Sequence, residues 1–251
     1  MRVSVITACL NSAATVLDTI RSVGGQTHRD IEHVFVDGGS QDATLDIIRA
    51  NCGPNAKLLT GPDAGIYDAL NKGLAASSGD LISFLHADDI YASVDVVATV
   101  VQAMAADSLD ALYGDVEFVR PENLAKVVRL YSSRRFSPSR IAWGWMPAHP
   151  ALFIASGVFA RFGGFKIDYK IAGDFEFIAR VFSKTEIRYR YLPKVLVRMR
   201  TGGLSTRGWR STLIINQESL RACRENGIPS NYLKILSKYP AKALEFLLVH
   251  K

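Results

Sequence analysis

The sequence lacks any apolar run long enough to cross a membrane. A spanning helix needs roughly 20 apolar residues, and the longest candidate, from Val94 to Ala106, is interrupted by Asp95 and Gln102. We therefore expect any membrane contact to be peripheral. The apolar stretch before Cys9 is also too short for the core of a signal peptide, so we expect it to form a buried first strand.

Cysteine is also scarce. The three cysteines, Cys9, Cys52 and Cys223, show neither CxxC spacing nor a nearby histidine cluster, which excludes a disulfide framework and a zinc site and fits a reducing, cytosolic location. With 251 residues, 48% of them hydrophobic and 22% charged, the chain can bury a sizeable core without such a staple.

Each half of the chain is poor in charge of one sign. Residues 1–115 hold 6 Lys/Arg and 15 Asp/Glu, a net charge of −9, whereas residues 116–251 hold 24 Lys/Arg and 9 Asp/Glu, a net charge of +15. The acidic half suits cations, and the basic half suits phosphates or an anionic surface. The positive residues are spread over many expected elements without a DNA- or RNA-binding motif, so we expect no nucleic-acid partner.

The first hundred residues alternate short β-branched runs with helical patterns, which is typical of a parallel sheet covered by helices. We expect strands at residues 2–8, 31–36, 56–60, 80–85 and 111–113. We expect helices near residues 13–24, 43–51, 66–76 and 94–106. Because ligands of such sheets bind at the carboxyl ends of the strands, the site is expected in the loops that start at Asn11, Asp37, Gly61 and His86.

After Asp115 the pattern loosens into expected edge strands, at residues 126–131, 151–155 and 194–200. A helix is expected to start near Asp174, and two more are expected over residues 209–225 and 231–249. The last of these is basic and amphipathic. Such a helix either packs on the domain or binds a membrane surface.

Two loops carry groups that suit a nucleotide and a metal ion. In the segment Val36 to Asp42 the glycines allow a ligand to approach closely and Asp37 offers an acceptor, although a simple helix cap explains the same pattern. Asp88 and Asp89 are adjacent carboxylates that repel each other unless a cation or donor compensates. Such oxygens select hard ions like Mg²⁺ or Mn²⁺; a solvated cap of the next helix is the alternative.

A third segment, from Asp63 to Gly73, starts a helix with a glycine. The free backbone N–H groups at such a helix start can bind a phosphate, and Lys72 offers a cation. The alternatives are structural: Asp68 and Lys72, four residues apart, form an ordinary helical ion pair, and Asp63 caps the helix. Asp174 likewise has helix capping as its alternative role.

Together these segments resemble glycosyltransferase family 2, in particular its small, non-processive branch that builds capsules, exopolysaccharides and colanic acid. The motifs follow the family's order over roughly residues 3–206. They are Thr7 to Asn11, Val36-Asp37-Gly38-Gly39-Ser40-Gln41-Asp42, Asp63 to Gly73, Leu85-His86-Ala87-Asp88-Asp89, His149-Pro150-Ala151-Leu152-Phe153, Gly163-Gly164-Phe165, Ala172-Gly173-Asp174-Phe175-Glu176 and Arg200-Thr201-Gly202-Gly203-Leu204-Ser205.

The resemblance implies an α/β fold of the GT-A type, with a single Rossmann-like, nucleotide-binding mixed sheet flanked by helices. Residues 1–115 would form the nucleotide-sugar and metal-binding half, residues 116–206 the acceptor-binding half, and residues 207–251 a basic, amphipathic helical extension. It also implies an inverting, metal-dependent hexosyltransferase that uses a nucleotide-diphospho-sugar, typically a UDP-sugar, together with Mg²⁺ or Mn²⁺.

The matched motifs also imply roles for single residues. Asp174 would be the catalytic base, Asp37 would hydrogen-bond the nucleotide base, Asp88 would contact the ribose or sugar, and Asp89, with Asp88 beside it, would bind the metal. The expected nucleotide-sugar-binding residues are Thr7, Asn11, Asp37, Gly38, Asp63, Tyr67, Asp68, Lys72, His86 and Asp88. The residues expected on the diphosphate or acceptor side are His149, Glu176, Arg200, Gly202 and Gly203.

Some features qualify these roles. Glu176 is a rival base, but it lies two residues beyond Asp174, about 200° around a helix, so only one of the two can point into the site. His149 is followed by Pro150, where the family usually has glutamine. The chain also lacks the Gln-x-x-Arg-Trp segment of processive synthases, so we expect transfer of single sugars.

The expected acceptor is a polyprenyl-diphosphate-linked glycan of surface-polysaccharide biosynthesis. The basic C-terminus would rest on the cytoplasmic face of the inner membrane. Two other functions compete. A sugar nucleotidyltransferase would need a basic, glycine-rich loop after the first strand, and Leu10-Asn11-Ser12-Ala13-Ala14 has neither glycine nor Lys/Arg. The other is a non-enzymatic, basic membrane- or nucleic-acid-binding module.

Overall fold

The computed structural model describes residues 1–184, 186–202 and 208–239. Its strands are β1 (Val3–Cys9), β2 (Ile31–Asp37), β3 (Ala56–Thr60), β4 (Leu81–Phe84), β5 (Ile90–Tyr91), β6 (Ala111–Arg120), β7 (Asn123–Tyr131), β8 (Leu152–Ala155) and β9 (Tyr189–Arg200). Its α-helices are α1 (Val16–Gly24), α2 (Thr44–Asn51), α3 (Ile66–Ala76), α4 (Val96–Ala106), α5 (Ser156–Phe162), α6 (Gly173–Phe182), α7 (Gly208–Glu225) and α8 (Tyr232–Leu236). Two short 3₁₀ helices are η1 (Pro138–Trp143) and η2 (His149–Ala151).

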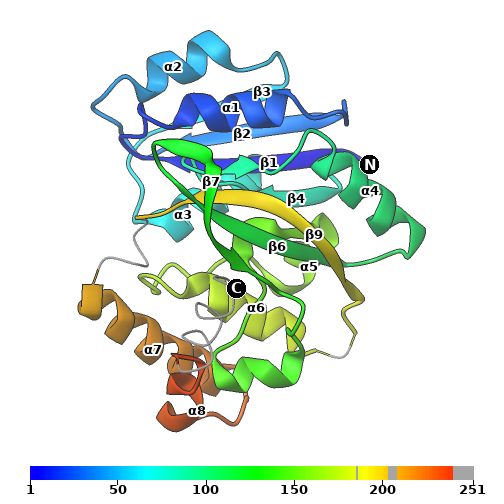
Figure 1. Cartoon of the computed structure of the whole chain (residues 1–251), viewed down its shortest axis with the longest axis vertical. Coiled ribbons are helices and arrows are strands. Elements are labelled where there is room, and N and C mark those ends of the chain that lie inside the picture. The colour runs from blue at the N-terminus through cyan, green and yellow to red at the C-terminus, as the bar shows by residue number, and fades with distance from the viewer. Residues whose placement is uncertain (185, 203–207, 240–251) are drawn as a thin grey trace.

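The strands of the described residues form one nine-stranded mixed sheet (Figure 1). The order is β3-β2-β1-β4-β8-β6-β9-β5, and β7 pairs with β6 as a hairpin. β1, β2, β3 and β4 run parallel to one another, as the alternating pattern predicts. β8 is antiparallel to both of its neighbours, β4 and β6. This arrangement confirms the expected α/β class with a mixed sheet.

Successive side chains of a strand point to opposite faces of the sheet, so the buried side chains form separate clusters on the two faces. Ile6 of β1 and Phe84 of β4 belong to a cluster that includes buried residues of α3, α5 and α6. Val5 of β1 and Leu81 of β4 point the other way, into a cluster that includes residues of α1 and α4. Helices therefore cover both faces, and the strand ends are left for a site.

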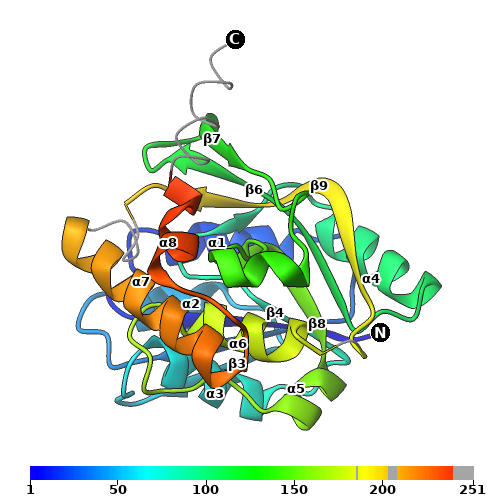
Figure 2. The ribbon, with the colours of Figure 1, turned by 90° about the horizontal axis from the view of Figure 1, so that it is seen from below.

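The C-terminal helices are part of this core. Leu220, Ala222 and Cys223 of α7 and Ile235 of α8 are buried in the same cluster as α3 and α6. α7 runs alongside α6, and α8 folds back against α7 (Figure 2). The segment expected as an extension from residue 207 onward therefore helps to hold α6 in place.

Two of the expected edge strands are not at an edge. β8 lies between β4 and β6, and β9 lies between β6 and β5. β8 has only four residues, and β9 mixes polar residues into its apolar run, so neither pattern marks a central strand. β7 pairs only with β6, as expected of an edge strand. The helix expected over residues 231–249 is α8 within the described part of the chain, and residues 240–249 lie outside it.

Candidate active site

The loops that the sequence singles out meet at one edge of the sheet. Cys9, near the end of β1, is in register with Asp37 at the end of β2, and Asp37 is in register with Thr60 at the end of β3. The backbone N–H of Leu85, just after β4, donates to the carbonyl of Ile6 in β1 at 3.0 Å. Because all four strands are parallel, the loops that follow them lie side by side, at the left of Figure 1.

Asp37 organises the loop that follows β2. Its buried carboxylate accepts hydrogen bonds from the backbone N–H groups of Gly39 and Ser40, at 3.0 and 2.9 Å, and from the Ser40 hydroxyl. The turn needs a glycine at position 39, where φ is +94°. A carboxylate held so firmly is a preorganised acceptor, because Oδ1, which accepts only from the Ser40 hydroxyl among the described residues, keeps a lone pair for a further donor.

Asn11 joins this loop to the loop after β1. Its side-chain oxygen accepts from the Gln41 backbone N–H, and its own backbone N–H donates to the Ser40 hydroxyl, both at 2.8 Å. Thr7 lies deeper and is fully buried. Its hydroxyl donates to the Leu85 carbonyl at 2.8 Å and lies 2.9 Å from the His33 ring, so Thr7 supports the floor of the site and its hydroxyl is already occupied.

Asp63 connects the Asp37 loop to the start of α3. It lies so close over Gly38 that a Cβ built there would be 2.3 Å from its carboxylate oxygen. Its other oxygen accepts from the Gly65 backbone N–H at 2.9 Å. A side chain at position 38 would displace the Asp63 carboxylate. Asp63 closes the turn before α3 rather than capping the helix, whose N-cap is Gly65 without a side-chain hydrogen bond.

Asp68 and Lys72 form the helical ion pair that their spacing suggests. The Lys72 ammonium lies 2.8 Å from the Asp68 carboxylate and also donates to the Pro62 carbonyl at 2.9 Å. Asp68 further accepts from the Ala64 backbone N–H. The pair holds the segment before α3 onto its first turn.

Asp88 and Asp89 follow β4 and differ sharply in exposure. Asp88 is half-buried, and its backbone carbonyl accepts from the Arg200 guanidinium at 2.6 Å. Asp89 is 1% exposed, and one of its carboxylate oxygens has no hydrogen-bond partner among the residues that the structure describes. Burial, then the charge of Asp88, raise the pKa of Asp89 well above its usual value, against the opposing charge of Arg200.

These two carboxylates are compatible with a divalent cation. The Asp89 oxygen is a buried acceptor to which no donor of the described residues is hydrogen-bonded, and Asp88 adds a second, accessible carboxylate. Across the described ranges no three His, Cys, Asp or Glu side chains are grouped so as to hold an ion. The pair therefore fits Mg²⁺ or Mn²⁺ of the kind that one or two carboxylates share with substrate phosphates and water.

His86 and His149 line the same region. Their ring centroids are 6.2 Å apart, and His149 also stacks on Phe84 at 5.4 Å. His149 is buried, and its Nε2 atom has no hydrogen-bond partner. Burial lowers the pKa of His149 to about 3, and the charge of His86 adds to this effect. His149 is therefore a neutral ring with one polar atom available.

Asp174 is the second residue of α6 and is half-buried. One carboxylate oxygen accepts from the Phe175 backbone N–H at 2.7 Å. Burial raises the pKa of Asp174 to about 6. Hydrogen bonds from backbone N–H groups at the helix start and from the Tyr67 hydroxyl lower this pKa, and the charge of Glu218 raises it. A carboxylate with such a pKa is ionised at pH 7 and is a better proton acceptor than an ordinary aspartate.

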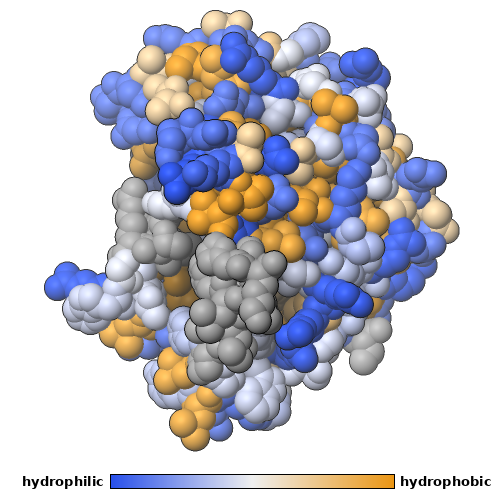
Figure 3. All heavy atoms as spheres, viewed as in Figure 1, coloured by the Kyte–Doolittle hydropathy of each residue, from blue (hydrophilic) through white to orange (hydrophobic). Residues whose placement is uncertain are grey.

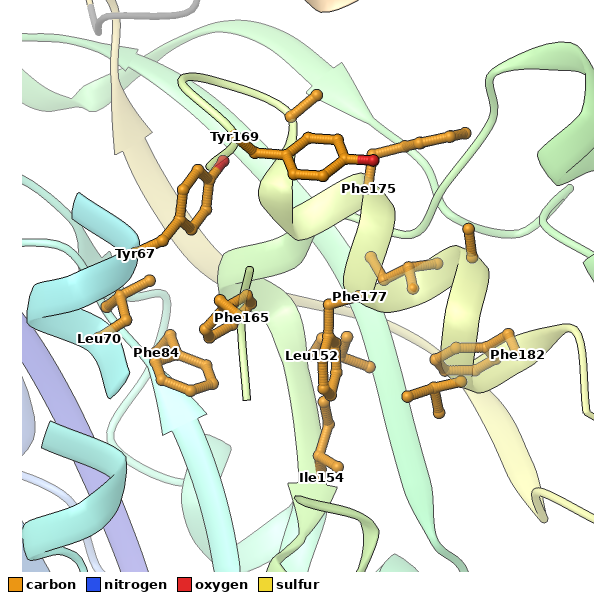
Figure 4. Close-up of a cluster of buried hydrophobic side chains, with 14 of the residues drawn as sticks. Tyr67, Leu70, Phe84, Leu152, Ile154, Phe165, Tyr169, Phe175, Phe177 and Phe182 are labelled. Atoms are coloured by element: carbon orange, nitrogen blue, oxygen red, sulfur yellow. The ribbon is translucent and has the colours of Figure 1, made fainter. Parts of the chain in front are cut away.

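Tyr67 of α3 contacts the segment before Asp174. Its hydroxyl donates to the Ile171 carbonyl and accepts from the Gly173 backbone N–H at 2.8 Å. In Figure 4 its ring reaches from α3 toward the loop that precedes α6. Tyr67 therefore links α3 to the segment before the expected base, and its expected contact with the nucleotide sugar stays a prediction.

Glu176 is buried in an ion-pair network. Its carboxylate lies 2.9 Å from the Arg180 guanidinium and 3.2 Å from the Lys166 ammonium. Both oxygens are engaged, so the geometry favours Asp174 over Glu176 as a base. Gly202 lies two residues after the end of β9 and has a φ of +104°. Gly203 lies outside the described residues.

A cavity of about 390 Å³ lies between the start of α3 and the loop before α6. It is lined by Ala64, Gly65, Ile66, Tyr67, Ile167, Asp168, Tyr169 and Lys170. Sequence reasoning missed two residues beside it, Asn71 and Glu218, which hydrogen-bond the backbone of the same loop. Asn71 lies within the Asp63 to Gly73 motif, and nothing local marks Glu218. The role of neither is visible in the sequence, because their partners are 94 and 48 positions away.

The chain is similar to several known glycosyltransferases. An uncharacterized glycosyltransferase of Mycobacterium tuberculosis is 37% identical over 182 residues, which cover 71% of this chain and 68% of the relative. A PGL/p-HBAD biosynthesis glycosyltransferase of the same species is 32% identical over 207 residues, which cover 80% and 78%.

Solved structures share the fold. S. aureus TarS 1–349 in complex with UDP-GlcNAc matches with a TM-score of 0.67 at 19% identity, covering 87% of this chain and 66% of that one. The mannosyltransferase PcManGT from Pyrobaculum calidifontis, in complex with GDP-Man and Mn²⁺, matches with a TM-score of 0.62 at 22% identity, covering 88% and 64%. This chain therefore spans slightly less than two thirds of either, and the likeness shows a GT-A-like fold.

The family match coincides with the loops described above. Residues 4–158 fit the profile of glycosyl transferase family 2. This range contains β1 to β4 and the loops at their carboxyl ends, and it stops before α6 and Asp174. The match covers more than half of the chain, and the chain therefore belongs to glycosyl transferase family 2.

Proposed function

We propose that the protein transfers a single hexose from a nucleotide-diphospho-sugar, specifically a UDP-sugar, to a hydroxyl group of a glycan, with inversion at the anomeric carbon. The observation that carries this proposal is Asp174, a half-buried carboxylate with a pKa of about 6. Tyr67 ties the loop before it to α3, and Asp63 packs the start of α3 against the Asp37 loop. A base on one side and a nucleotide-binding loop on the other are what a direct transfer requires.

The donor side consists of the loops after β1, β2 and β4. Asp37 is the acceptor for a donor group of the nucleotide base, and Asn11 fixes the neighbouring loop against it. Asp88 and Asp89 would hold Mg²⁺ or Mn²⁺, which when bound supplies positive charge to the diphosphate of the donor. His86 and His149 lie beside these carboxylates on the diphosphate side.

The chemistry at the acceptor follows from the properties of Asp174. Its carboxylate removes the proton from the acceptor hydroxyl while that oxygen attacks the anomeric carbon from the face opposite the nucleotide. The bond between the anomeric carbon and the diphosphate oxygen breaks, and the diphosphate leaves with the bonding electrons. One displacement suffices, so no covalent enzyme intermediate forms.

We propose a polyprenyl-diphosphate-linked glycan as the acceptor, bound peripherally at the cytoplasmic face of the inner membrane. The net charge of +15 beyond residue 115 supports an anionic acceptor. Hydrophobic side chains are exposed on β7 and α8, where Figure 3 shows apolar surface; they are Val127, Val128, Leu130, Leu233 and Leu236. None of the helices in the described ranges is long and apolar enough to cross a bilayer. The relative with a named pathway acts in PGL/p-HBAD biosynthesis. The proposal that this chain acts in surface-polysaccharide biosynthesis is therefore supported by the sequence motifs and not by that relative.

The test is a panel of UDP-, GDP- and dTDP-sugars, with and without Mg²⁺ or Mn²⁺, read out as a change in melting temperature and as release of nucleoside diphosphate. A UDP-sugar is expected to stabilise the chain in a metal-dependent way, by about 2.7 kcal/mol when the free ligand is at 100 times its Kd. A chain that responds to no donor, with or without metal, contradicts the proposal.

A matched variant separates the metal from the nucleotide. Asp88→Asn keeps the size of a half-exposed side chain and removes its charge. We expect it to fold with a nearly unchanged melting temperature in the absence of ligand and to lose the metal-dependent part of the stabilisation. Full metal-dependent stabilisation in this variant would remove Asp88 from the cation site.

A further inference from the structure

The expected base follows a loop without regular secondary structure. Residues 163–172 connect α5 to α6 and contain neither helix nor strand. Asp174 itself can be only as well placed as the backbone of this loop. A displacement of about 1 Å at a reacting group costs on the order of 100-fold in rate. The contacts that fix the backbone immediately before Asp174 therefore bear directly on catalysis.

Glu218 of α7 holds the end of this loop through its backbone. One carboxylate oxygen accepts from the Lys170 N–H at 2.7 Å, and the other accepts from the N–H groups of Ile171 and Ala172 at 2.9 and 2.8 Å. These three residues immediately precede α6, whose second residue is Asp174. Hydrogen bonds to a charged acceptor are about twice as strong as neutral ones, so a single side chain from another helix fixes three successive peptide groups.

Two side chains of α3 hold the same loop from the opposite side. Tyr67 binds the Ile171 carbonyl and the Gly173 N–H, so Ile171 is bonded on both of its peptide groups. Asn71 binds the other end of the loop. Its side-chain oxygen accepts from the Phe165 N–H at 2.8 Å, and its side-chain nitrogen donates to the Phe165 carbonyl at 2.7 Å. The ring of Tyr67 from α3 and the ring of Phe165 from this loop lie near each other, with centroids 5.7 Å apart (Figure 4).

We infer that Glu218 is a positioning residue for Asp174, which it serves by clamping the backbone of residues 170–172 between α7 and α3. The inference rests on the proposed function, since it concerns the base of that reaction. It makes α7, which lies outside the residues that match the family profile, a part of the machinery for transfer.

Glu218 acts on Asp174 in two ways that a purely structural side chain would not combine. It fixes the path of the backbone into α6. Its negative charge also adds to the effect of burial in raising the pKa of Asp174 to about 6. Replacing the carboxylate by an amide removes this charge and turns an N–H donor toward a backbone N–H group.

The test compares Glu218→Gln with Glu225→Gln in the full chain. Glu225 is on the same helix, two turns farther on. Its carboxylate binds Arg221 and two side chains of the same loop, Lys166 and Tyr169, but not the backbone of residues 170–172. It therefore controls for loss of a carboxylate that contacts the loop through side chains alone. For Glu218→Gln we expect kcat to fall by about 10- to 100-fold, the donor KM to stay within about twofold, and the acid limb of the kcat profile to move to lower pH. Glu225→Gln should keep both kcat and the acid limb.

Amide hydrogen exchange provides a readout that needs no substrate. The N–H groups of residues 170–172 are expected to exchange faster in Glu218→Gln and to keep their rates in Glu225→Gln. Unchanged exchange at these amides overturns the clamp, whether or not the protein transfers sugar. Faster exchange with wild-type kcat and pH profile overturns the positioning role while leaving the proposed function intact.

A second variant covers the case in which Glu218→Gln fails to fold. Glu218→Asp keeps the charge but is one methylene shorter, so it reaches fewer of the three N–H groups. We expect an intermediate kcat with the acid limb at its wild-type position, because the charge near Asp174 remains. A kcat equal to that of the wild type would overturn the inference.

Discussion

Asp174 is placed where burial and hydrogen bonding compete. Burial disfavours its charge, whereas the N–H groups at the start of α6 favour it, and burial prevails with a pKa of about 6. Since this folded-state value lies above the ordinary value of 3.8, the folded chain binds more protons than the unfolded chain between these two pH values. The free energy of unfolding therefore falls as the pH rises through this window, and the loss persists at higher pH.

Asp174→Asn is expected to separate catalysis from stability. Transfer should fall by about 10²- to 10⁴-fold, the usual contribution of a positioned base, because the amide cannot accept the proton. Above pH 6 the variant should unfold with a free energy equal to or greater than that of the wild type, by on the order of 1–3 kcal/mol at most, because it buries no charge. The measurements are kcat against pH, with an acid limb near pH 6 in the wild type only, and urea unfolding at pH 5 and pH 8. Near-normal turnover would remove Asp174 from the base role.

At the scale of elements, the contact between α3 and α6 sets the distance between the donor loops and the base. Gly173 lets the two helices meet, since a Cβ at this position would lie 2.7 to 2.9 Å from carbons of the Tyr67 ring. Real Cβ atoms essentially never come so close, and the buried ring has little room to retreat. The glycine is therefore required by packing against another helix, and its φ is not positive.

Gly173→Ala should push the start of α6 away from α3. Overpacking of this kind costs about 1–3 kcal/mol, and we expect kcat to fall at the same time because Asp174 moves with the helix. The matched control is Gly157→Ala in α5, where nothing lies within 4 Å of the added carbon; there we expect a gain of about 0.5–1 kcal/mol. Thermal melting and kcat measure both effects. Wild-type kcat in Gly173→Ala would show that the spacing of α3 and α6 does not limit transfer.

The sequence predicts the elements of the first half well and those of the second half less well, for a physical reason. β1, β2 and β4 are buried almost throughout and consist mainly of Val, Ile, Leu and Phe, because both of their faces are covered, and each is followed by a turn-forming segment. β9 carries polar residues along its length although it is paired on both sides. β5 has two residues and α5 has seven, too few to show a period.

The same limit applies to the site. The carboxylates of Asp37, Asp88 and Asp174 stand in motifs, so their chemistry is visible in the sequence. The contacts that place Asp174 are not visible, since Tyr67 and Glu218 reach its loop across 104 to 106 and 46 to 48 positions. The burial that raises the pKa of Asp174 also depends on the packed fold rather than on neighbouring residues in the chain.

At the scale of the whole molecule, the fold extends beyond the segment that carries the motifs. Leu220 is 2% exposed, and Ala222, Cys223 and Ile235 are fully buried, all in the cluster that also contains Phe177 of α6. Removing one buried Leu or Ile side chain costs about 2–5 kcal/mol, and a whole domain is stable by only about 5–15 kcal/mol. The boundary expected after residue 206 therefore cuts through the core.

Two truncations test where the functional unit ends. A chain of residues 1–206 is expected to lose cooperative unfolding, because it lacks Ile235, the buried face of α7 and the Glu218 clamp. A chain of residues 1–239 retains these groups and should keep its melting temperature, its response to the donor and its transfer to a short water-soluble acceptor. It should bind anionic vesicles more weakly than the full chain, because the basic C-terminus is expected to contact the membrane. Circular dichroism, donor-dependent melting and vesicle sedimentation distinguish the two chains. Cooperative unfolding of 1–206 would show that α7 and α8 are dispensable for folding. Wild-type vesicle binding by 1–239 would assign the membrane contact to the exposed residues of β7 and α8, because those are apolar side chains that this chain still presents.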